Sequence, residues 1–254
     1  MIEYYTKFIA WRVFSHAQVV DLCGNTKTAE TVLYHSKRKG LIQHVKRSLY
    51  VAISLETGSS IASPYEIASQ ITADSYISHH TAFSYYGFAN QVFTTITVSS
   101  SSRFKSFEYD GYWYQFKQSY SNQGLINAHG VRATVLERTI IDTIRDFSKT
   151  TGLEELLRCL SMITVVNESE LLAYLTVYDN QFLFQKTGYI LSHFKKGLKL
   201  SDQFFSKCLS LIGKSVRYFY EDIKSEVSVY NSEWQLFVPN NLMETLDEGG
   251  DEIV

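Results

Sequence analysis

The sequence predicts an α+β protein, with an N-terminal winged helix-turn-helix followed by a larger mixed α/β domain that has an antiparallel sheet and several helices. Two observations lead to this fold class. Between Ser15 and Ile53, helix caps, a short turn and a basic hairpin follow one another in the order of a winged helix. Beyond residue 63, segments of alternating apolar residues lie between stretches of helical periodicity.

Composition places the chain among ordinary globular proteins, with 254 residues, 45% hydrophobic and 20% charged. The net charge of −2 is unevenly distributed. Residues 1–60 hold eight Lys and Arg against four Asp and Glu, which gives this end a surplus of four positive charges and leaves the remainder with six negative ones. A basic end on an acidic body attracts polyanions to one side of the molecule.

The three cysteines, Cys23, Cys159 and Cys208, are far apart and form no CxxC pair. This spacing argues against a disulfide or zinc framework and indicates reduced thiols in the cytoplasm. We find no secretory signal pattern at the N-terminus and no apolar run long enough to span a bilayer. A cytoplasmic protein without membrane association is expected.

The winged module begins with a helix over residues 2–13. Ser15 and Gln18 then form a capping box for a short helix that Gly24 ends. Asn25 or Thr26 caps the next helix, which is expected to run to about Lys39. Two strand-like runs, 41–45 and 48–53, follow and are joined through Lys46-Arg47 as a basic wing.

The helix that ends near Lys39 has the pattern of a recognition helix. At 100° per residue, Ala29, Val32, Leu33 and Ser36 fall on one side, suited to packing. The opposite side carries donors, Thr methyl groups and an aromatic ring, which suits the major groove. An amphipathic helix and hairpin with solvated charges is the alternative, but the order of the elements favours DNA binding. The expected DNA-binding residues are Lys27, Thr28, Thr31, His35, Lys37, Arg38, Lys39, Lys46 and Arg47.

A Gly/Ser-rich stretch over residues 55–62 indicates a linker between domains 1–57 and 63–254, with few contacts crossing it. Ser63-Pro64-Tyr65-Glu66 opens a capped helix expected to reach Ile71, and a second helix runs from Ser78 to Gly87. Strands are expected over 91–99, 104–109 and 112–117, the last two joined at Asp110-Gly111, and over 125–133 with a break at Gly130.

Helices then resume. Thr134 and Glu137 are expected to form a capping box for a helix that ends near Phe147. Four further helices are expected over 153–163, 169–178, 182–194 and 201–212, with Gly188 as a weak point in the third of them. One late strand is expected over 227–238, ending before Pro239, and an acidic tail from about residue 240 is expected to be disordered.

The helix after Thr134 carries Glu137, Arg138, Asp142, Arg145 and Asp146. Arg138 and Asp142 are spaced (i, i+4), and Asp142 and Arg145 are spaced (i, i+3), so both pairs can meet on the helix. These charges form either a docking or active site, or a cap and a brace against the sheet. We favour the cap and brace.

No metal or cofactor site is expected. His79 and His80 are adjacent on a helix and diverge by about 100°, so they cannot share one ion, and no Cys or acid stands at ligand spacing in the sequence. His16, His35 and His44 lie in the basic end, where hydrogen bonds to phosphate or bases suit them better. The sequence holds no GxSxG, Walker A, HExxH or GxGxxG motif, so an enzyme is not expected.

Four stretches, in order, resemble the AbiEi-type antitoxins of the AbiE abortive-infection systems, which are type IV toxin–antitoxin modules. They are KRKGLIQHVKRSLYVAI, SPYEIASQI, SYISHHTAFSYYGFANQVFTTITV and VRATVLERTIIDTIRD. The resemblance covers residues 14–194 approximately, and Glu137, Arg138 and Asp142 match the family's charged helix. Ser48 stands where the family usually has Gly, and because Ser tolerates positive φ less well we expect a different wing turn.

The resemblance implies an antitoxin of a phage-defence system. Such a protein binds inverted repeats in its own promoter through the winged helix and represses transcription, which is autoregulation. Its C-terminal domain counteracts a nucleotidyltransferase toxin without a stable complex between the two. The alternative is an enzyme or effector that DNA binding recruits, with an acidic site around Glu137 and Asp142. A nucleotidyltransferase gene next to this one would favour the antitoxin.

Overall fold

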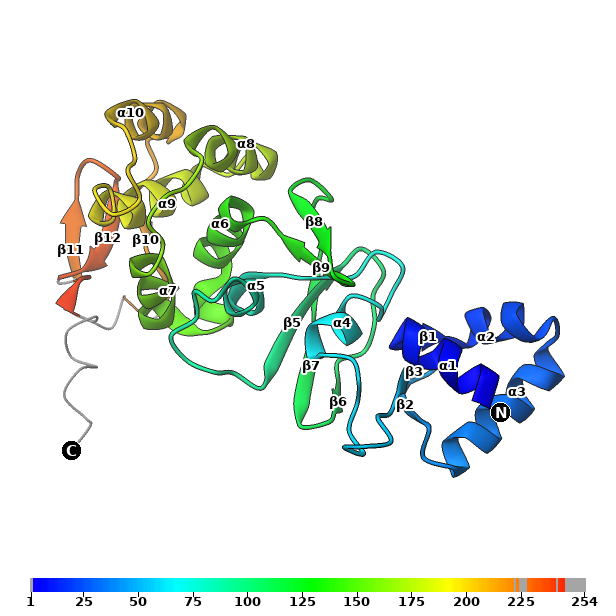
Figure 1. Ribbon diagram of the computed structural model, residues 1–254. Helices are drawn as coiled ribbons and strands as arrows, with labels where there is room; N and C mark the ends of the chain where they lie inside the picture. The colour runs from blue at the N-terminus through cyan, green and yellow to red at the C-terminus, as the bar shows by residue number, and fades with distance from the viewer. Residues whose placement is uncertain (1, 222, 224–227, 241, 245–254) are drawn as a thin grey trace, which may run out of the picture. The chain divides into compact units, whose positions relative to one another are not determined.

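The computed structural model describes residues 2–221, 223, 228–240 and 242–244, and within them the protein is α+β, as the sequence predicts (Figure 1). The chain divides into two compact units. The first comprises residues 1–77, 94–119 and 126–133, and the second comprises 78–93, 120–125 and the described part of 134–254. The predicted boundary between residues 57 and 63 lies inside the first unit.

The N-terminal elements of the first unit have the order of a winged helix. Ser15 and Gln18 form the predicted capping box, Gly24 ends α2 at φ 76°, and Asn25 caps α3 through Thr28 N. The rings of Phe8 and Phe14 stack at 4.5 Å in the core beneath α3. The elements are α1 (Ile2–Trp11), β1 (Val13–Ser15), α2 (His16–Cys23), α3 (Thr26–Arg38), β2 (Ile42–Lys46) and β3 (Leu49–Ala52), and the sheet has the order β1-β3-β2.

The wing turn corrects one expectation. Ser48 adopts φ 64°, the left-handed conformation that glycine favours. The wing turn therefore has the positive φ expected of a glycine at this position, although the residue is Ser. The Ser48 carbonyl accepts a hydrogen bond from His16 N at 2.9 Å, which ties the turn to the start of α2. A register shift between His44 and Lys46 adds a bulge to β2.

Several contacts join the winged helix to the predicted linker and to residues beyond it, whereas few were expected. Arg12 Nε lies 2.5 Å from Glu66 Oε1, and Arg12 also donates to the Ile61 carbonyl. Tyr109 Oη donates to the Gln43 side chain at 2.8 Å. Residues 55–62 therefore do not separate two independent bodies in this unit.

The rest of the first unit is built around a six-stranded mixed sheet with the order β6-β7-β5-β4-β9-β8. β5 pairs in parallel with β7, and β4 pairs in parallel with β9, so the sheet is mixed where an antiparallel one was expected. Helix α4 contacts strands β4 and β5. The elements are α4 (Pro64–Ala68), β4 (Tyr76–Ile77), β5 (Thr95–Ser100), β6 (Phe107–Tyr109), β7 (Tyr112–Gln118), β8 (Leu125–Ala128) and β9 (Val131–Thr134).

The two predicted turns of this sheet are present. Asp110 and Gly111 adopt φ 52° and 76° between β6 and β7, and the break at Gly130 separates β8 from β9. Several bounds differ from the prediction, and strand β6 begins at Phe107 rather than residue 104. Helix α4 stops at Ala68 rather than Ile71. The next residue, Ser69, accepts a hydrogen bond at its Oγ from Arg132 N at 2.8 Å. Strand β5 begins at Thr95 rather than residue 91.

Helix α6 lies among the helices of the second unit and contacts α5, α7, α8 and α9 (Figure 1). All residues from Arg138 to Ile144 are buried, which explains the mixture of apolar and charged side chains in this segment. The helices are α5 (His79–Tyr86), α6 (Leu136–Asp146), α7 (Gly152–Ser161), α8 (Glu168–Tyr178), α9 (Gln181–His193) and α10 (Asp202–Leu211), with a 3₁₀ turn at Phe147–Lys149.

A small sheet with the order β10-β12-β11 completes the second unit, formed by β10 (Arg217–Tyr218), β11 (Ser228–Asn231) and β12 (Leu236–Pro239). The single late strand that was predicted is therefore wrong, and Pro239 lies within β12. Trp234, which is 1% exposed, sits in the turn between the strands and packs on Gly188, where a Cβ would lie 2.0 Å from its ring. This contact explains a glycine inside α9.

The predicted capping box at the start of α6 is also wrong. Val135 is the N-cap and has no side-chain cap hydrogen bond. Thr134 Oγ1 instead hydrogen-bonds with Thr139 Oγ1 at 2.7 Å, and Glu137 accepts from Asn167 N at 2.8 Å. The predicted disordered tail from about residue 240 is wrong at its start, because Leu242 is 3% exposed and packs in the core of the second unit. The acidic residues beyond 244 lie outside the described residues. Across the described chain, every helix is too short or too polar to cross a membrane.

Candidate nucleic-acid interface

The outward face of α3 is formed as predicted. Ala29, Val32, Leu33 and Ser36 are buried against the winged-helix core. The expected contact residues of this helix and its end are all exposed: Lys27, Thr28, Thr31, His35, Lys37, Arg38 and Lys39. Glu30 is the single acid in α3, so the exposed face offers mainly donors and methyl groups to a ligand.

Two contacts organise this face. The Thr31 hydroxyl donates to the Lys27 carbonyl at 3.0 Å, so the hydroxyl is used within the helix and the methyl group remains for an outside partner. The Arg38 guanidinium lies 5.7 Å from the centroid of the Tyr34 ring, one helical turn earlier. Tyr34 is 58% exposed and was not among the expected contact residues, although its place on the outer face of the helix was visible in the sequence.

The two wing cations differ. Arg47 is exposed at the turn. Lys46 is half-buried, and its Nζ lies 4.9 Å and 5.5 Å from the ring centroids of Phe104 and Phe107. Desolvation lowers the pKa of Lys46. An ammonium held over two rings is less available to phosphate than a free guanidinium.

A hollow of about 410 Å³ lies beside α3 and the wing, lined by His16, Glu30, Leu33, Tyr34, Lys37, His44 and Tyr50. Desolvation and then the charge of Lys37 lower the pKa of His44 below 6.5. A neutral imidazole is therefore present at neutral pH, and protonation of His44 contributes to anion binding only in more acidic solution.

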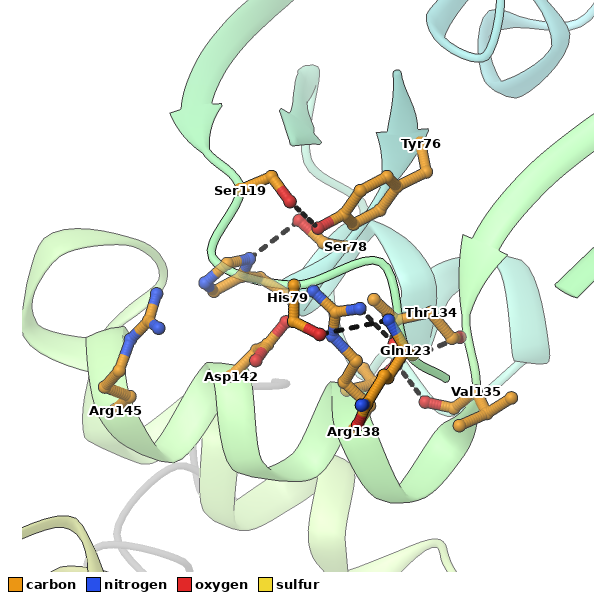
Figure 2. Close-up of polar contacts among 12 residues, drawn as sticks. Tyr76, Ser78, His79, Ser119, Gln123, Thr134, Val135, Arg138, Asp142 and Arg145 are labelled. Carbon is orange, nitrogen blue, oxygen red and sulfur yellow. Dashed lines mark hydrogen bonds and ion pairs between the residues drawn. The ribbon is translucent and has the colours of Figure 1, made fainter. Parts of the chain in front are cut away.

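Arg138 reaches from α6 toward the chain at Gln123, and Asp142 lies beside it on the same helix (Figure 2). Arg138 donates to the Gln123 carbonyl, and its Nε lies 3.4 Å from Asp142 Oδ2. Asp142 also accepts from the Tyr178 hydroxyl. Arg138 and Asp142 are each 2% exposed, so this pair braces the chain from inside.

The predicted pair between Asp142 and Arg145 is not the one formed. Arg145 instead donates to Asp146 Oδ2 at 2.8 Å, and its guanidinium lies 4.4 Å and 4.5 Å from the ring centroids of Tyr120 and Tyr178. His79 Nε2 approaches the same Asp146 oxygen at 3.2 Å. Burial alone would raise the pKa of Asp146, but His79 and Arg145 outweigh it and lower that pKa well below 3.8.

The second histidine has partners that sequence spacing did not reveal. His80 Nε2 lies 2.8 Å from Glu155 Oε1, and Cys159 Sγ lies 3.5 Å from the same oxygen. Asn90 N and Gln91 N donate to this oxygen as well, which explains why the chain there does not extend β5. The three donor atoms of His80, Glu155 and Cys159 lie within 4.8 Å of one another and are of types that hold zinc.

Comparisons with known proteins add a fold and no function. No protein-family model and no curated protein matches the sequence. Among solved structures, the chain is similar to the RV2827C protein from Mycobacterium tuberculosis, a crystal structure, with a TM-score of 0.66 and 16% sequence identity. The alignment covers 94% of this chain and 90% of that one. At this identity the likeness shows a shared fold alone.

Proposed function

We propose that the winged helix binds double-stranded DNA, with α3 in the major groove and the wing beside the backbone. The observation that carries this proposal is the exposed face of α3, where Thr31 and Arg38 stand among donors with a single acid in the helix. Thr methyl groups suit the thymine C5-methyl, and an Arg suits guanine or phosphate. Arg47 reaches the backbone from the wing, and Lys46 contributes less because its ammonium lies over Phe104 and Phe107.

We further propose that the protein is the antitoxin of a type IV toxin–antitoxin system of the abortive-infection class, acting in the cytoplasm. It represses its own promoter by binding inverted repeats, and the chain beyond the winged helix, residues 63–254, counteracts a nucleotidyltransferase toxin without a stable complex. The support for this role is the resemblance of the four ordered stretches to AbiEi-type antitoxins, together with the winged-helix order of the N-terminal elements.

The alternative, an enzyme with an acidic site on α6, has less support. Glu137 accepts from Asn167 N, and Asp142 is paired with Arg138 and bonded to Tyr178. Both carboxylates are therefore engaged in holding segments of the second unit together. We propose a non-enzymatic protein without metal or cofactor in this role.

Footprinting on the DNA upstream of the protein's own gene tests the DNA-binding part. We expect a protected inverted repeat, lost in the Thr31→Ala, Arg38→Ala double variant and kept in Lys196→Met, which changes an exposed lysine of the second unit. Co-expression with a nucleotidyltransferase toxin encoded beside this gene tests the antitoxin part, and absence of such a gene would count against it. Protection of DNA without rescue of growth would leave a repressor and overturn the antitoxin.

A further inference from the structure

A cavity in the second unit has the charge and the aromatic walls of an anion site. It measures about 520 Å³, within the range of small-molecule pockets. Among the described residues, four cations line it, Arg145, Lys149, Lys186 and Arg217, against one acid, Glu221. The cavity lies between α6 and the 3₁₀ turn after it, α9, and residues 216–221, which include β10, and no part of it belongs to the winged helix.

Lys186 is the unusual member of this group. It is 6% exposed, and its Nζ donates to the Arg145 carbonyl at 3.2 Å and lies 4.6 Å and 5.2 Å from the ring centroids of Phe147 and Phe182. Within the described residues, no carboxylate forms an ion pair with it. Asp146, whose charge favours the ammonium, is already bound to Arg145 and His79.

A buried ammonium without a counter-ion is costly, and an anion that enters the cavity offsets that cost. Arg145 supplies a second cation that is already held in place, because the rings of Tyr120 and Tyr178 both lie against its guanidinium and Asp146 accepts from its Nη2 atom. Lys149 and Arg217 are exposed and add charge at the rim. Several cations around one cavity suit a ligand with more than one negative charge.

The aromatic residues of the cavity indicate what else the ligand carries. Phe182, Tyr218, Phe219 and Tyr220 line it together with the cations. Tyr218 is 42% exposed, and its ring stacks on Phe237 at 5.0 Å, which holds it in position. A planar base stacks on such a ring, while cations bind phosphate groups.

We propose that this cavity binds a nucleoside di- or triphosphate, with the phosphates at Lys186, Arg145 and Arg217 and the base against Tyr218 and Phe182. The proposal does not depend on the DNA-binding or antitoxin role. It gives the second unit a small-molecule ligand, which the proposed function does not assign.

Calorimetric titration of the full chain with ATP, pyrophosphate and adenosine tests the proposal. We expect ATP to bind more tightly than pyrophosphate and both more tightly than adenosine. Lys186→Met and Arg217→Gln should each weaken ATP binding about tenfold or more, since each removes a charge-assisted contact. Lys196→Met is the matched control, because it removes an exposed charge outside the cavity, and it should bind ATP as the original chain does.

Two further variants distinguish binding in the cavity from binding to the winged helix and from a defect in folding. The Arg38→Ala, Arg47→Ala double variant should keep ATP binding, because the winged helix is not involved, even if it loses DNA. Arg217 is exposed, so its variant remains informative if Lys186→Met does not fold. Absence of ATP binding at millimolar concentration, or equal binding by Lys186→Met, Arg217→Gln and the original chain, would overturn the proposal. Equal affinity for ATP and pyrophosphate would overturn the base-stacking part.

Discussion

Arg12 Nε lies 2.5 Å from Glu66 Oε1, and Arg12 Nη2 lies 3.0 Å from Glu66 Oε2, so the residue after α1 holds the acid that closes the capping box of α4. Glu66 accepts from Ser63 N with the same carboxylate, and Arg12 adopts φ 62° at the end of α1. One carboxylate therefore closes a capping box and anchors the winged helix to the chain beyond residue 62. This relationship makes the first unit continuous across the predicted linker.

Replacing Glu66 with Gln should lower the free energy of unfolding by about 0.5–1 kcal/mol, the size of a partly exposed ion pair. Burial alone would raise the pKa of Glu66, but hydrogen bonds from Arg12 and Ser63 hold it below 4.5. The contribution is thus present above the unfolded pKa and is lost as the pH falls through the folded one. Urea unfolding at pH 7 and pH 3 measures it. Glu56→Gln, an exposed acid in the same unit, is the control, and equal stability of both variants would contradict the argument.

Thr31→Ala and Arg38→Ala should each weaken specific DNA binding by about 1–3 kcal/mol, the cost of one lost base contact. The Thr31 hydroxyl is already bonded to the Lys27 carbonyl, so the loss at this position should come from the methyl group. Thr31→Val, which keeps a methyl group at the same place, should bind nearly as well as the original chain. Gel-shift titration with the footprinted site measures these affinities. If Thr31→Ala and Arg38→Ala both bind the site as tightly as the original chain does, another face of α3 meets the DNA.

Arg47→Ala should reduce the slope of log affinity against log salt by about 0.9, the value for one lost phosphate contact. Lys46→Ala should reduce it less, because the ammonium lies over the rings of Phe104 and Phe107. Titrations between 50 and 200 mM salt, about a fourfold range, give both slopes. Equal reductions would mean that Lys46 leaves its rings when DNA binds.

Glu137→Gln should lower thermal stability, because the carboxylate that accepts from Asn167 N joins α6 to the start of α8. If Glu137 is only such a brace, rescue from the toxin should fall in proportion to the folded fraction. Circular dichroism and a growth assay on the same variant compare the two quantities. A variant that stays fully folded yet loses all rescue would make α6 a functional site.

Local signals predicted much of the fold and little of the second unit's interior. The box of Ser15 and Gln18 and the turn at Asp110-Gly111 act through neighbouring residues, so the sequence displays them directly. Glu155 Oε1 accepts from Asn90 N and Gln91 N, which are 64 or more residues away in the sequence. A contact over that separation leaves no periodic pattern from which it could be predicted. Gly188 likewise lowers the predicted stability of its helix, and only the structure shows that the Trp234 ring leaves no room for a side chain there.

The candidate DNA-binding face of α3 was predictable from the sequence, and the cavity around Lys186 was not. Exposure on α3 follows from a 3.6-residue period, so its outer face was predicted residue by residue. Lys186 gave no signal, because a lysine in a helix is usually exposed and only the packing of Phe147 and Phe182 around it shows otherwise.

Lys186→Met should stabilise the protein at pH 7 while it weakens nucleotide binding. Desolvation lowers the pKa of Lys186 from 10.5 to about 8, so the folded state holds this proton less tightly than the unfolded state does. Below pH 8 Lys186 is charged in both the folded and the unfolded state, so folding includes the full free-energy cost of burying the charge. Between pH 8 and 10.5 the folded state has released the proton and the unfolded state has not, so the stability of the original chain rises with pH there.

Methionine fills a similar volume without the charge, so its advantage should be about 1–3 kcal/mol at pH 7 and should shrink toward pH 10. Urea unfolding of both chains at the two pH values measures the difference, and Lys196→Met should change stability by less than about 0.5 kcal/mol. A lower stability of Lys186→Met at pH 7 would show that the bond from Nζ to the Arg145 carbonyl and the two ring contacts outweigh the burial of the charge. In that case Lys186 stabilises the folded protein, and weaker ATP binding by Lys186→Met could come from a folding defect. The affinity of Arg217→Gln for ATP would then be the test of the cavity.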